Sequence, residues 1–258
     1  MSKKYRSFRL LPALLLAFLL PATAWAQLPG DLQFGLQFSP TFSSMGTNNN
    51  LINGDGSNLG VKLGVVGEYY FRENYSLHTG LGFHFNAGGT LFYEDQFERV
   101  DIWRESLDEF LPANTLPDSL SGGLGYKYDL RFVEIPLGLT LRTREFGYLS
   151  YYVRPALHLG ILTKSNGSVR GAGFIDEEEK FDISAETNSL NLSWSLGAGI
   201  EYSVSQTTAL VAGLAYQSGF ADLTTDKGTA VRRQGRNETE DDSRGRLNSF
   251  VITLGVMF

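Results

Sequence analysis

The stretch "NSFVITLGVMF", residues 248–258, decides the fold. Every second residue from Phe250 to Phe258 is large and apolar, and the residues between them are small or mixed. A period of two is typical of a β-strand with one apolar face. The segment ends on an aromatic residue, whereas the last residues of a soluble domain usually fray into water.

The same alternation recurs along the chain, for example in "LNLSWSLGAGIEYSV" and "YSLHTGLGFHFNA". The predicted strands cover residues 31–42, 59–72, 75–90, 125–143, 148–165, 189–203, 207–221 and 246–258. The intervals between them alternate between long polar segments (43–58, 91–124, 166–188, 222–245) and tight turns (73–74, 144–147, 205–206). This arrangement is typical of a membrane barrel, whose closure leaves no unpaired backbone edge in lipid. We therefore predict an all-β fold over residues 27–258: an eight-stranded antiparallel transmembrane β-barrel with long extracellular loops and short periplasmic turns.

A soluble β-sandwich or lipocalin-like barrel would show the same alternation with its faces reversed. Two further features favour the membrane barrel. The mixed face combines many Gly and Ser residues with charged and histidine side chains, as suits a crowded barrel interior: Lys62, Glu68, Arg72, His78, His84, Glu134, Arg142, Arg154, His158 and Glu201. Aromatic residues gather beside the tight turns, as in an interfacial girdle: Tyr69, Phe71, Tyr75, Phe146, Tyr148, Tyr151, Tyr202 and Phe258.

The first residues predict export. Four basic residues precede the apolar run "LLPALLLAFLLPA", and Ala24 and Ala26 form a small-x-small cleavage pattern. The apolar run is shorter than the roughly 20 residues of a spanning helix. We therefore expect residues 1–26 to be a signal peptide, although an uncleaved N-terminal anchor is the alternative.

Charge and cysteine content exclude several classes. Removing residues 1–26 removes four positive charges and no negative ones, so the formal net charge moves from -6 to -10. Nucleic-acid binding demands a basic surface, so nucleic acid is not an expected partner. The absence of cysteine excludes a disulfide framework.

The final strand resembles the sorting signal that the barrel-assembly machinery reads, with Phe250, Leu254, Val256 and Phe258 as its apolar face. The chain also resembles the PorT-type outer-membrane β-barrel proteins of the Bacteroidetes. The resemblance rests on "FVEIPLGLTLR" (residues 132–142), "YVRPALHLGILTKS", "LGAGIEYSV", "LAYQSGFADL", "FGLQFSPTFSS" and "FVITLGVMF". It implies an eight-stranded barrel in the outer membrane and an association with protein secretion. A proline in a central strand removes a ladder donor, so we expect a bulge or a loosened pairing at Pro136.

An eight-stranded barrel is filled by its own side chains. Isolated charges inside it would be costly, so we predict a lumen polar network. Its members are Lys62, Glu68, Glu134, Arg142, Arg154, His158 and Glu201, with Glu134 and Glu201 neutralising Arg142, Arg154 or Lys62.

No catalytic residue, cofactor or metal ligand is assigned. His78 and His84 lie six residues apart on one strand face, about 20 Å, which is too far to share a metal. The segment 91–124 carries Phe92, Phe97, Trp103 and Phe110 among acidic residues. It could extend the third strand or form a short helix, and its aromatic residues could either meet a partner or pack on their own neighbours.

We therefore expect a non-enzymatic integral outer-membrane barrel with a structural, binding or accessory role in the cell envelope, with a link to protein secretion as the family-based guess. The alternatives are an envelope-lipid-modifying enzyme and a narrow pore. The expected partners are outer-membrane lipid, the barrel-assembly machinery and, through the extracellular loops, a secretion or envelope protein.

Overall fold

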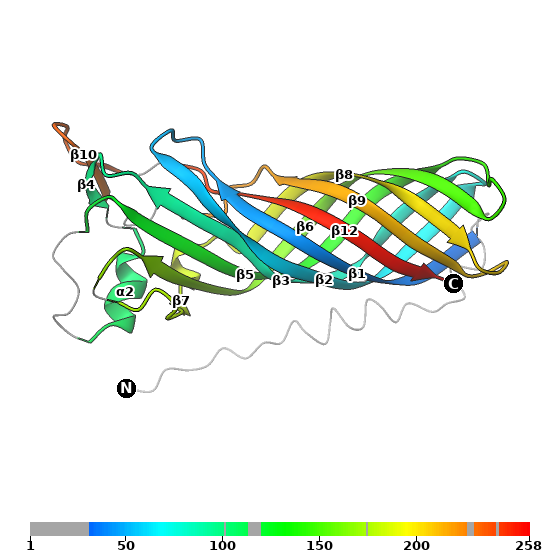
Figure 1. Cartoon of the computed structure of the whole chain (residues 1–258), viewed down its shortest axis with the longest axis horizontal. Coiled ribbons are helices and arrows are strands. Elements are labelled where there is room, and N and C mark those ends of the chain that lie inside the picture. Colours follow the sequence, from blue (N-terminus) through cyan, green and yellow to red (C-terminus); the bar gives the residue numbers. More distant parts are fainter. Residues whose placement is uncertain (1–30, 101, 113–119, 174, 226–229, 241–242) are drawn as a thin grey trace, which may run out of the picture.

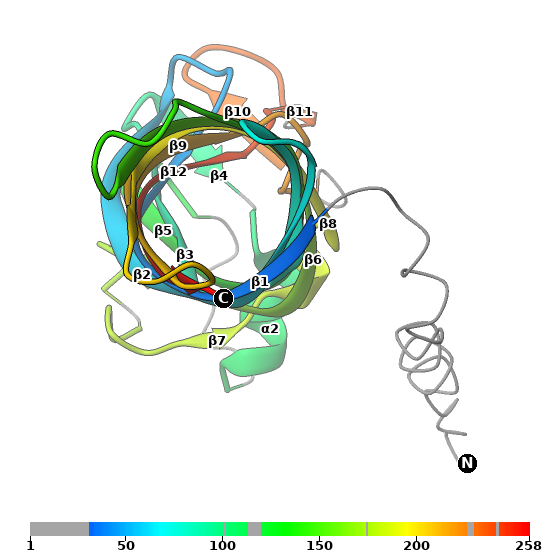
Figure 2. The same cartoon turned by 90° about the vertical axis from the view of Figure 1, so that its right-hand side faces the viewer.

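Eight long antiparallel strands close into a barrel (Figures 1 and 2). The computed structural model describes residues 31–100, 102–112, 120–173, 175–225, 230–240 and 243–258. The barrel strands are β1 (Asp31–Gly46), β2 (Ile52–Arg72), β3 (Tyr75–Tyr93), β5 (Leu124–Arg142), β6 (Leu149–Arg170), β8 (Leu190–Ser203), β9 (Ala209–Gly219) and β12 (Arg246–Met257). Each pairs with the next along the chain, and β12 returns to β1. The predicted fold class is confirmed. The predicted signal peptide, with Ala24 and Ala26, lies outside the described residues.

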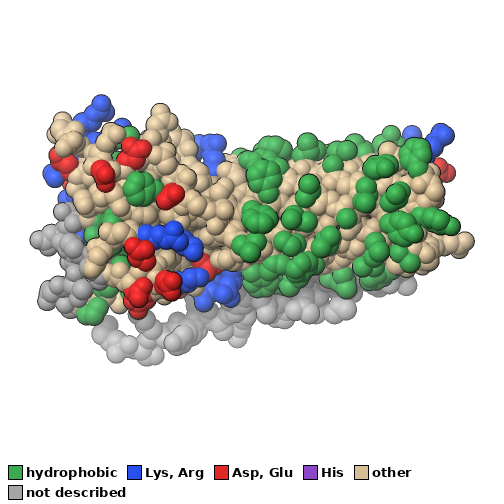
Figure 3. Space-filling view, viewed as in Figure 1, with side chains coloured by type: hydrophobic (Ala, Val, Ile, Leu, Met, Phe, Trp, Pro, Cys, Tyr) green, Lys and Arg blue, Asp and Glu red, His purple; other side chains and the backbone are tan. Residues whose placement is uncertain are grey.

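The outer wall carries a belt of apolar side chains (Figure 3). Of the alternate residues of the last strand, Phe250, Leu254, Val256 and Phe258 are exposed on this wall and Ile252 is half-buried. Seven of the eight girdle aromatics are also exposed beside the tight turns, and Tyr69 is half-buried. Phe71 stacks on Tyr75 with ring centroids 6.3 Å apart. The apolar face predicted from the alternation is therefore the outer face of the barrel.

Prolines interrupt the ladders without shifting their register. The pairing of β3 with β5 lapses opposite Pro136 and resumes with the same offset, from Thr79 with Leu137 to Gly82 with Glu134. Because proline has no N–H to donate, the loosened pairing occurs here rather than a bulge. One register shift lies at the turn end, between Tyr70 and Arg72, and the others lie nearer the extracellular end, including one that follows His84 in β3. Asn86, within this bulge, has a φ of 56°.

Small residues on the inner face make room for large ones. Tyr152 projects from β6 across Gly199 and Gly213 of the neighbouring strands. A Cβ on Gly213 would lie 2.3 Å from the Tyr152 hydroxyl oxygen, so only glycine fits there. Tyr152 packs with Val66, Val211 and Met257 in a small apolar cluster toward the turn end of the interior. The Gly-rich alternate face therefore corresponds to a filled interior.

At the extracellular end the chain builds a folded cap (left in Figure 1). The cap comprises the outer ends of the barrel strands with β4 (Phe97–Val100), α2 (Arg104–Phe110), β7 (Phe181–Asp182), the 3-10 turn η2 (Ser184–Glu186), β10 (Ala230–Arg233) and β11 (Thr239–Glu240). β4, β10 and β11 form a separate small sheet, and β7 adds to the edge of β6. Strands β2 and β6 reach seven and five residues further into the cap than their alternation predicted, beginning at Ile52 and ending at Arg170.

The cap has its own hydrophobic core. Trp103 lies at its centre, 1% exposed, with edge-on ring contacts to Tyr126, Tyr128 and Phe181. Phe97 and Leu107 are also fully buried there. Both structures considered for residues 91–124 are present, since β3 extends to Tyr93 and α2 is a short helix. The aromatic residues pack mainly on their own neighbours, so the idea that they are exposed for a partner is wrong for Phe97 and Trp103. Within the described ranges, no helix has the length and hydrophobicity to cross a bilayer.

Candidate functional site in the barrel interior

The barrel interior holds two clusters of charged side chains. The first, toward the turn end, is centred on Glu68 of β2, which is fully buried. Arg154 Nη2 donates to Glu68 Oε1 at 2.6 Å, and Arg142 Nη2 donates to Glu68 Oε2. Arg142 also forms a bidentate ion pair with Glu201, with Nε 2.6 Å from Oε2 and Nη2 2.9 Å from Oε1. Two arginines thus neutralise two glutamates supplied by four different strands.

The second cluster lies further toward the cap and is centred on Glu134 of β5. Lys62 Nζ donates to Glu134 Oε2 at 2.6 Å and to Gln217 Oε1 at 2.6 Å. His84 Nδ1 lies 3.2 Å from Glu134 Oε1, and its Nε2 lies 3.1 Å from Thr41 Oγ1. The charge of Lys62 therefore balances that of Glu134. Gln217 and His84 form further hydrogen bonds with this ion pair.

The structure places all seven residues of the predicted polar network on the inner face. Six of them enter the two clusters, while His158 stands apart and bonds to Ser195, with Nε2 2.8 Å from Oγ. Arg72, predicted to face inward, is exposed at the turn. The β2–β3 register shifts between Tyr70 and Arg72, which takes Arg72 out of the alternation.

Neutral polar residues that the sequence analysis did not single out complete the clusters. Gln217 links Lys62 to Ser193, to which its Nε2 donates at 2.7 Å. Thr140 receives a 2.9 Å bond from Arg154 Nε, and Ser76 donates to Glu68 at 2.8 Å. The alternation places these residues on the mixed face. Their hydrogen-bond partners depend on which strands lie side by side and in which register. The alternation along a single strand does not contain that information.

The space left between the clusters is small. A cavity of about 70 Å³ is lined by Lys62, His78, Tyr152, Arg154, His158 and Gln217 among others. Ligand pockets usually measure about 300–1,000 Å³, so this cavity suits a few water molecules rather than a substrate. The interior is therefore packed, as expected of an eight-stranded barrel.

The His158–Ser195 pair has the geometry of a base beside a hydroxyl nucleophile. Such a pair normally needs a third group to orient the base. Among the described residues, no carboxylate bonds to the second ring nitrogen of His158. The pair also faces only the 70 Å³ cavity. The arrangement therefore serves hydrogen bonding inside the wall better than acyl transfer.

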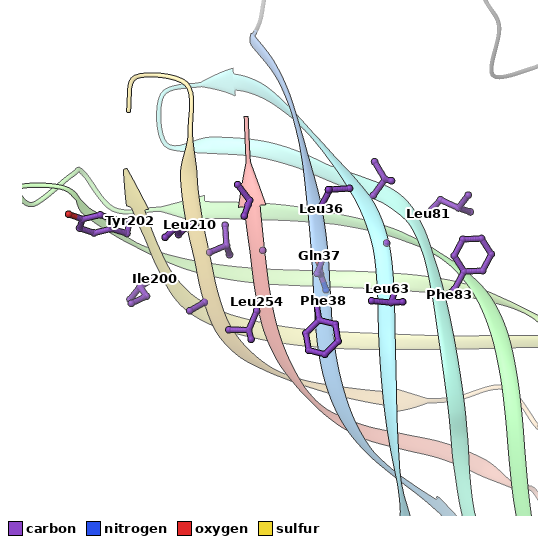
Figure 4. A pocket seen from close by; sticks show the side chains of 16 residues that line it. Leu36, Gln37, Phe38, Leu63, Leu81, Phe83, Ile200, Tyr202, Leu210 and Leu254 are labelled. Atoms are coloured by element: carbon purple, nitrogen blue, oxygen red, sulfur yellow. The ribbon is translucent and has the colours of Figure 1, made fainter. Parts of the chain in front are cut away.

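A larger hollow of about 870 Å³ lies on the outer wall, across the seam between β1 and β12 (Figure 4). Outward side chains such as Leu36, Phe38, Leu63 and Leu254 border it, and each is at least 43% exposed. Its lining is almost entirely hydrocarbon. The hollow belongs to the apolar belt, and its polar side chains are Gln37, which donates to Ser39, and Tyr202.

An even ring of antiparallel strands, an apolar belt with an aromatic border and a charge-balanced interior together define an integral outer-membrane β-barrel. The chain belongs to the family described as "Outer membrane protein beta-barrel domain", whose model matches residues 25–225. The family and the belt place it in the outer membrane. No curated protein matches the chain.

Solved outer-membrane proteins are similar at low identity. Neisserial surface protein A is 11% identical, with 87% of this chain and 95% of that chain covered and a TM-score of 0.41. A major outer membrane protein from Thermus thermophilus is 12% identical, with 88% and 100% covered and a TM-score of 0.42. Ail, the attachment invasion locus protein of Yersinia pestis, is 12% identical, with 88% and 98% covered and a TM-score of 0.38.

Proposed function

We propose that this protein is a non-enzymatic outer-membrane barrel that anchors and displays its folded cap as a binding or structural surface of the cell envelope. The observation that carries the proposal is the structural difference between the barrel interior and the cap. The charged side chains of the interior pair with one another, while the cap forms a separate hydrophobic core around Trp103.

The packed interior argues against the two alternatives. A pore needs a continuous aqueous path, and Arg142, bonded to both Glu68 and Glu201, lies across the interior. An envelope-lipid-modifying enzyme needs a reactive group that its substrate can reach. The best-placed candidate, His158 with Ser195, borders a cavity of only about 70 Å³.

The accessory role in secretion is the finer part of the proposal. Its support is the resemblance of "FVEIPLGLTLR" and the other quoted segments to the PorT-type barrels of the Bacteroidetes. The expected partners remain outer-membrane lipid, the barrel-assembly machinery and a secretion or envelope protein that meets the cap.

The cap offers a mixed surface to such a protein. Phe110 is 36% exposed and stacks on Phe181 with ring centroids 5.1 Å apart, so it is held in a fixed position. Acidic residues 176–179 lie exposed in the segment before β7. Aromatic residues are enriched in the cores of protein interfaces, whereas the rim of an interface is polar. Phe110 would therefore suit the core of such an interface, and the acidic residues would suit its rim.

Site-specific photo-crosslinking in intact outer membranes tests the proposal. A photo-reactive residue replaces Phe110 or Glu178 in the cap, and the matched control replaces Phe146, which is 66% exposed at the opposite end. We expect a discrete adduct, identified by mass spectrometry, from the cap positions only.

Two results would overturn the proposal. One is the absence of any cap adduct combined with an unchanged phenotype after deletion of residues 97–112. The other is envelope-lipid modification that His158→Ala abolishes, or stepwise conductance in a planar bilayer.

A further inference from the structure

Two basic side chains face each other on the outer wall of the barrel. Arg131 of β5 and Lys164 of β6 are direct cross-strand partners, and both are exposed. Like charges in directly opposed positions destabilise a sheet, because the side chains of such a pair lie only about 5 Å apart at their Cβ atoms. The repulsion would be relieved by an anion placed between the two side chains, and the described part of the chain forms no ion pair with either of them.

A bulge creates this pairing. The register between β5 and β6 shifts between Arg131 and Phe132, so that Thr163 is the extra residue on β6. Thr163 Oγ1 donates to the backbone oxygen of Arg131 at 3.0 Å, which fixes the bulge. Thr163 and Lys164 are both exposed as a result, whereas a regular strand would turn one of them inward.

Two acidic residues near the pair have other hydrogen-bond partners among the described residues. Asp129, two residues further along β5, is held by Lys180, with Nζ 2.6 Å from Oδ2. Asp182 of β7 accepts bonds from the backbone N–H and the hydroxyl of Ser184 at 2.7 and 2.5 Å. Within the described part of the chain, neither Arg131 nor Lys164 forms an ion pair.

The pair lies at the extracellular border of the apolar belt. The outward residues on the membrane side of Arg131 and Lys164 include Ile135 and Ile161, which are 38% and 41% exposed. On the other side the cap begins with Asn166, which pairs with β7. Figure 3 shows Lys and Arg side chains beside this border. An anion bound here would lie at the depth of lipid headgroups in the outer leaflet.

We propose that Arg131 and Lys164 bind the phosphate of an anionic, acylated lipid in the outer leaflet. A phosphate accepts charge-assisted hydrogen bonds from both side chains and removes their mutual repulsion. The lipid's acyl chains would lie on the belt, on residues such as Ile135 and Ile161. A soluble phosphate would lack that second contact, which is why the depth of the pair favours a lipid.

The test uses the full-length protein in a neutral detergent, with diphosphorylated lipid A as the probe. Binding is measured by native mass spectrometry for the wild type and for Arg131→Gln/Lys164→Gln. The matched control is Lys127→Gln/Arg170→Gln, which removes the same charge from the same strands further from the belt. Retained heat-modifiable mobility on gels shows that each variant is folded.

We expect the test variant to bind lipid A roughly twenty-five-fold more weakly, because each basic residue near a membrane anion contributes about a fivefold factor. The control should bind as the wild type does. Lipid A should also raise the melting temperature of the wild type but not that of the test variant. Without lipid, the test variant should melt at or above the wild-type temperature, since its like-charge repulsion is gone.

Three outcomes would overturn the proposal. The first is equal lipid A binding by the test variant and the wild type. The second is a lower melting temperature of the test variant without lipid, which would show that the pair is structural. The third is equal stabilisation by inorganic phosphate or by dephosphorylated lipid A, which would point to a soluble anion or to acyl contacts alone.

Discussion

Lys62 Nζ lies 2.6 Å from Glu134 Oε2, and the strand β3 separates the two strands that carry these residues. The bond therefore passes over the inner face of β3 and links two strands that are not paired with each other. Both side chains are about a tenth exposed or less. Removing one partner would leave the other charge buried and unpaired, which makes this pair the most direct measure of how much the interior network stabilises the barrel.

Glu134→Gln should destabilise the barrel by about 3–5 kcal/mol, because it leaves the Lys62 charge uncompensated. The measurement is the temperature at which the folded band disappears on unheated gels in detergent. The double variant Lys62→Met/Glu134→Gln should recover most of the loss, since no charge then stays unpaired. An unchanged melting temperature for Glu134→Gln would show that the pair contributes nothing.

Arg142→Met should cost more stability than Arg154→Met. Arg142 bonds to both Glu68 and Glu201, whereas Arg154 lies 2.6 Å from Glu68 but 4.0 Å from Glu201. Loss of the Arg142 guanidinium therefore leaves more buried carboxylate charge without a cation than loss of Arg154 does. Denaturant unfolding of both variants under the same conditions checks the ranking. Equal midpoints, or a larger effect from Arg154→Met, would contradict the hydrogen-bond pattern.

Gly167→Ala should loosen the cap and leave the barrel intact. A Cβ at Gly167 would lie 2.5 Å from the Trp103 ring, so the cap core must shift, at a cost of about 1–3 kcal/mol. Gly46→Ala is the matched control, because its nearest neighbour would lie 3.8 Å away. Limited proteolysis should cut the cap faster only in Gly167→Ala, with the heat-modifiable mobility of both variants unchanged.

The stability of the cap should fall as the pH rises through the titration of Glu186. This carboxyl is 7% exposed, its hydroxyl partner Ser106 lies 3.4 Å away, and Glu105 adds negative charge. Burial raises the pKa of Glu186 above its unfolded value. The stabilisation is therefore complete below the unfolded pKa and is lost above the folded one.

Glu186→Gln should remove this pH dependence and give a more protected α2 at neutral pH. Hydrogen exchange of residues 104–110, measured from acidic to neutral pH, provides the comparison. A wild-type cap that gains protection with rising pH would contradict the direction of the shift.

Phe258→Ala should slow assembly of the barrel in cells more than it lowers the stability of the assembled protein. The N–H of Phe258 donates to the Phe34 oxygen at 2.8 Å, and the Phe34 N–H donates back at 3.1 Å, so the backbone seam persists without the ring. Phe146→Ala is the control, because it removes a girdle aromatic away from the last strand that is 66% exposed, against 56% for Phe258. Equal assembly defects in both variants would contradict a specific role of Phe258 in assembly.

The sequence alone determined the barrel strands and their faces. Alternation is a local property, so residues such as Leu254 and Glu134 reveal on which side of a strand they lie without knowledge of the neighbouring strand. The long and short intervals then gave the up-and-down order and the two ends. The charges expected inside are inside, with the exception of Arg72, where the register shift at the strand end breaks the period.

Only the tertiary structure decided which charges meet, what the cap is and where like charges oppose each other. Lys62 reaches Glu134, and Arg131 faces Lys164, because of strand order, register and one bulge at Thr163. These are relations between segments far apart in the chain, and one inserted residue changes them. The core of the cap could not be predicted from the sequence for the same reason. Trp103 and Gly167 lie far apart in the chain and come into contact only when the loops fold onto the extended strands.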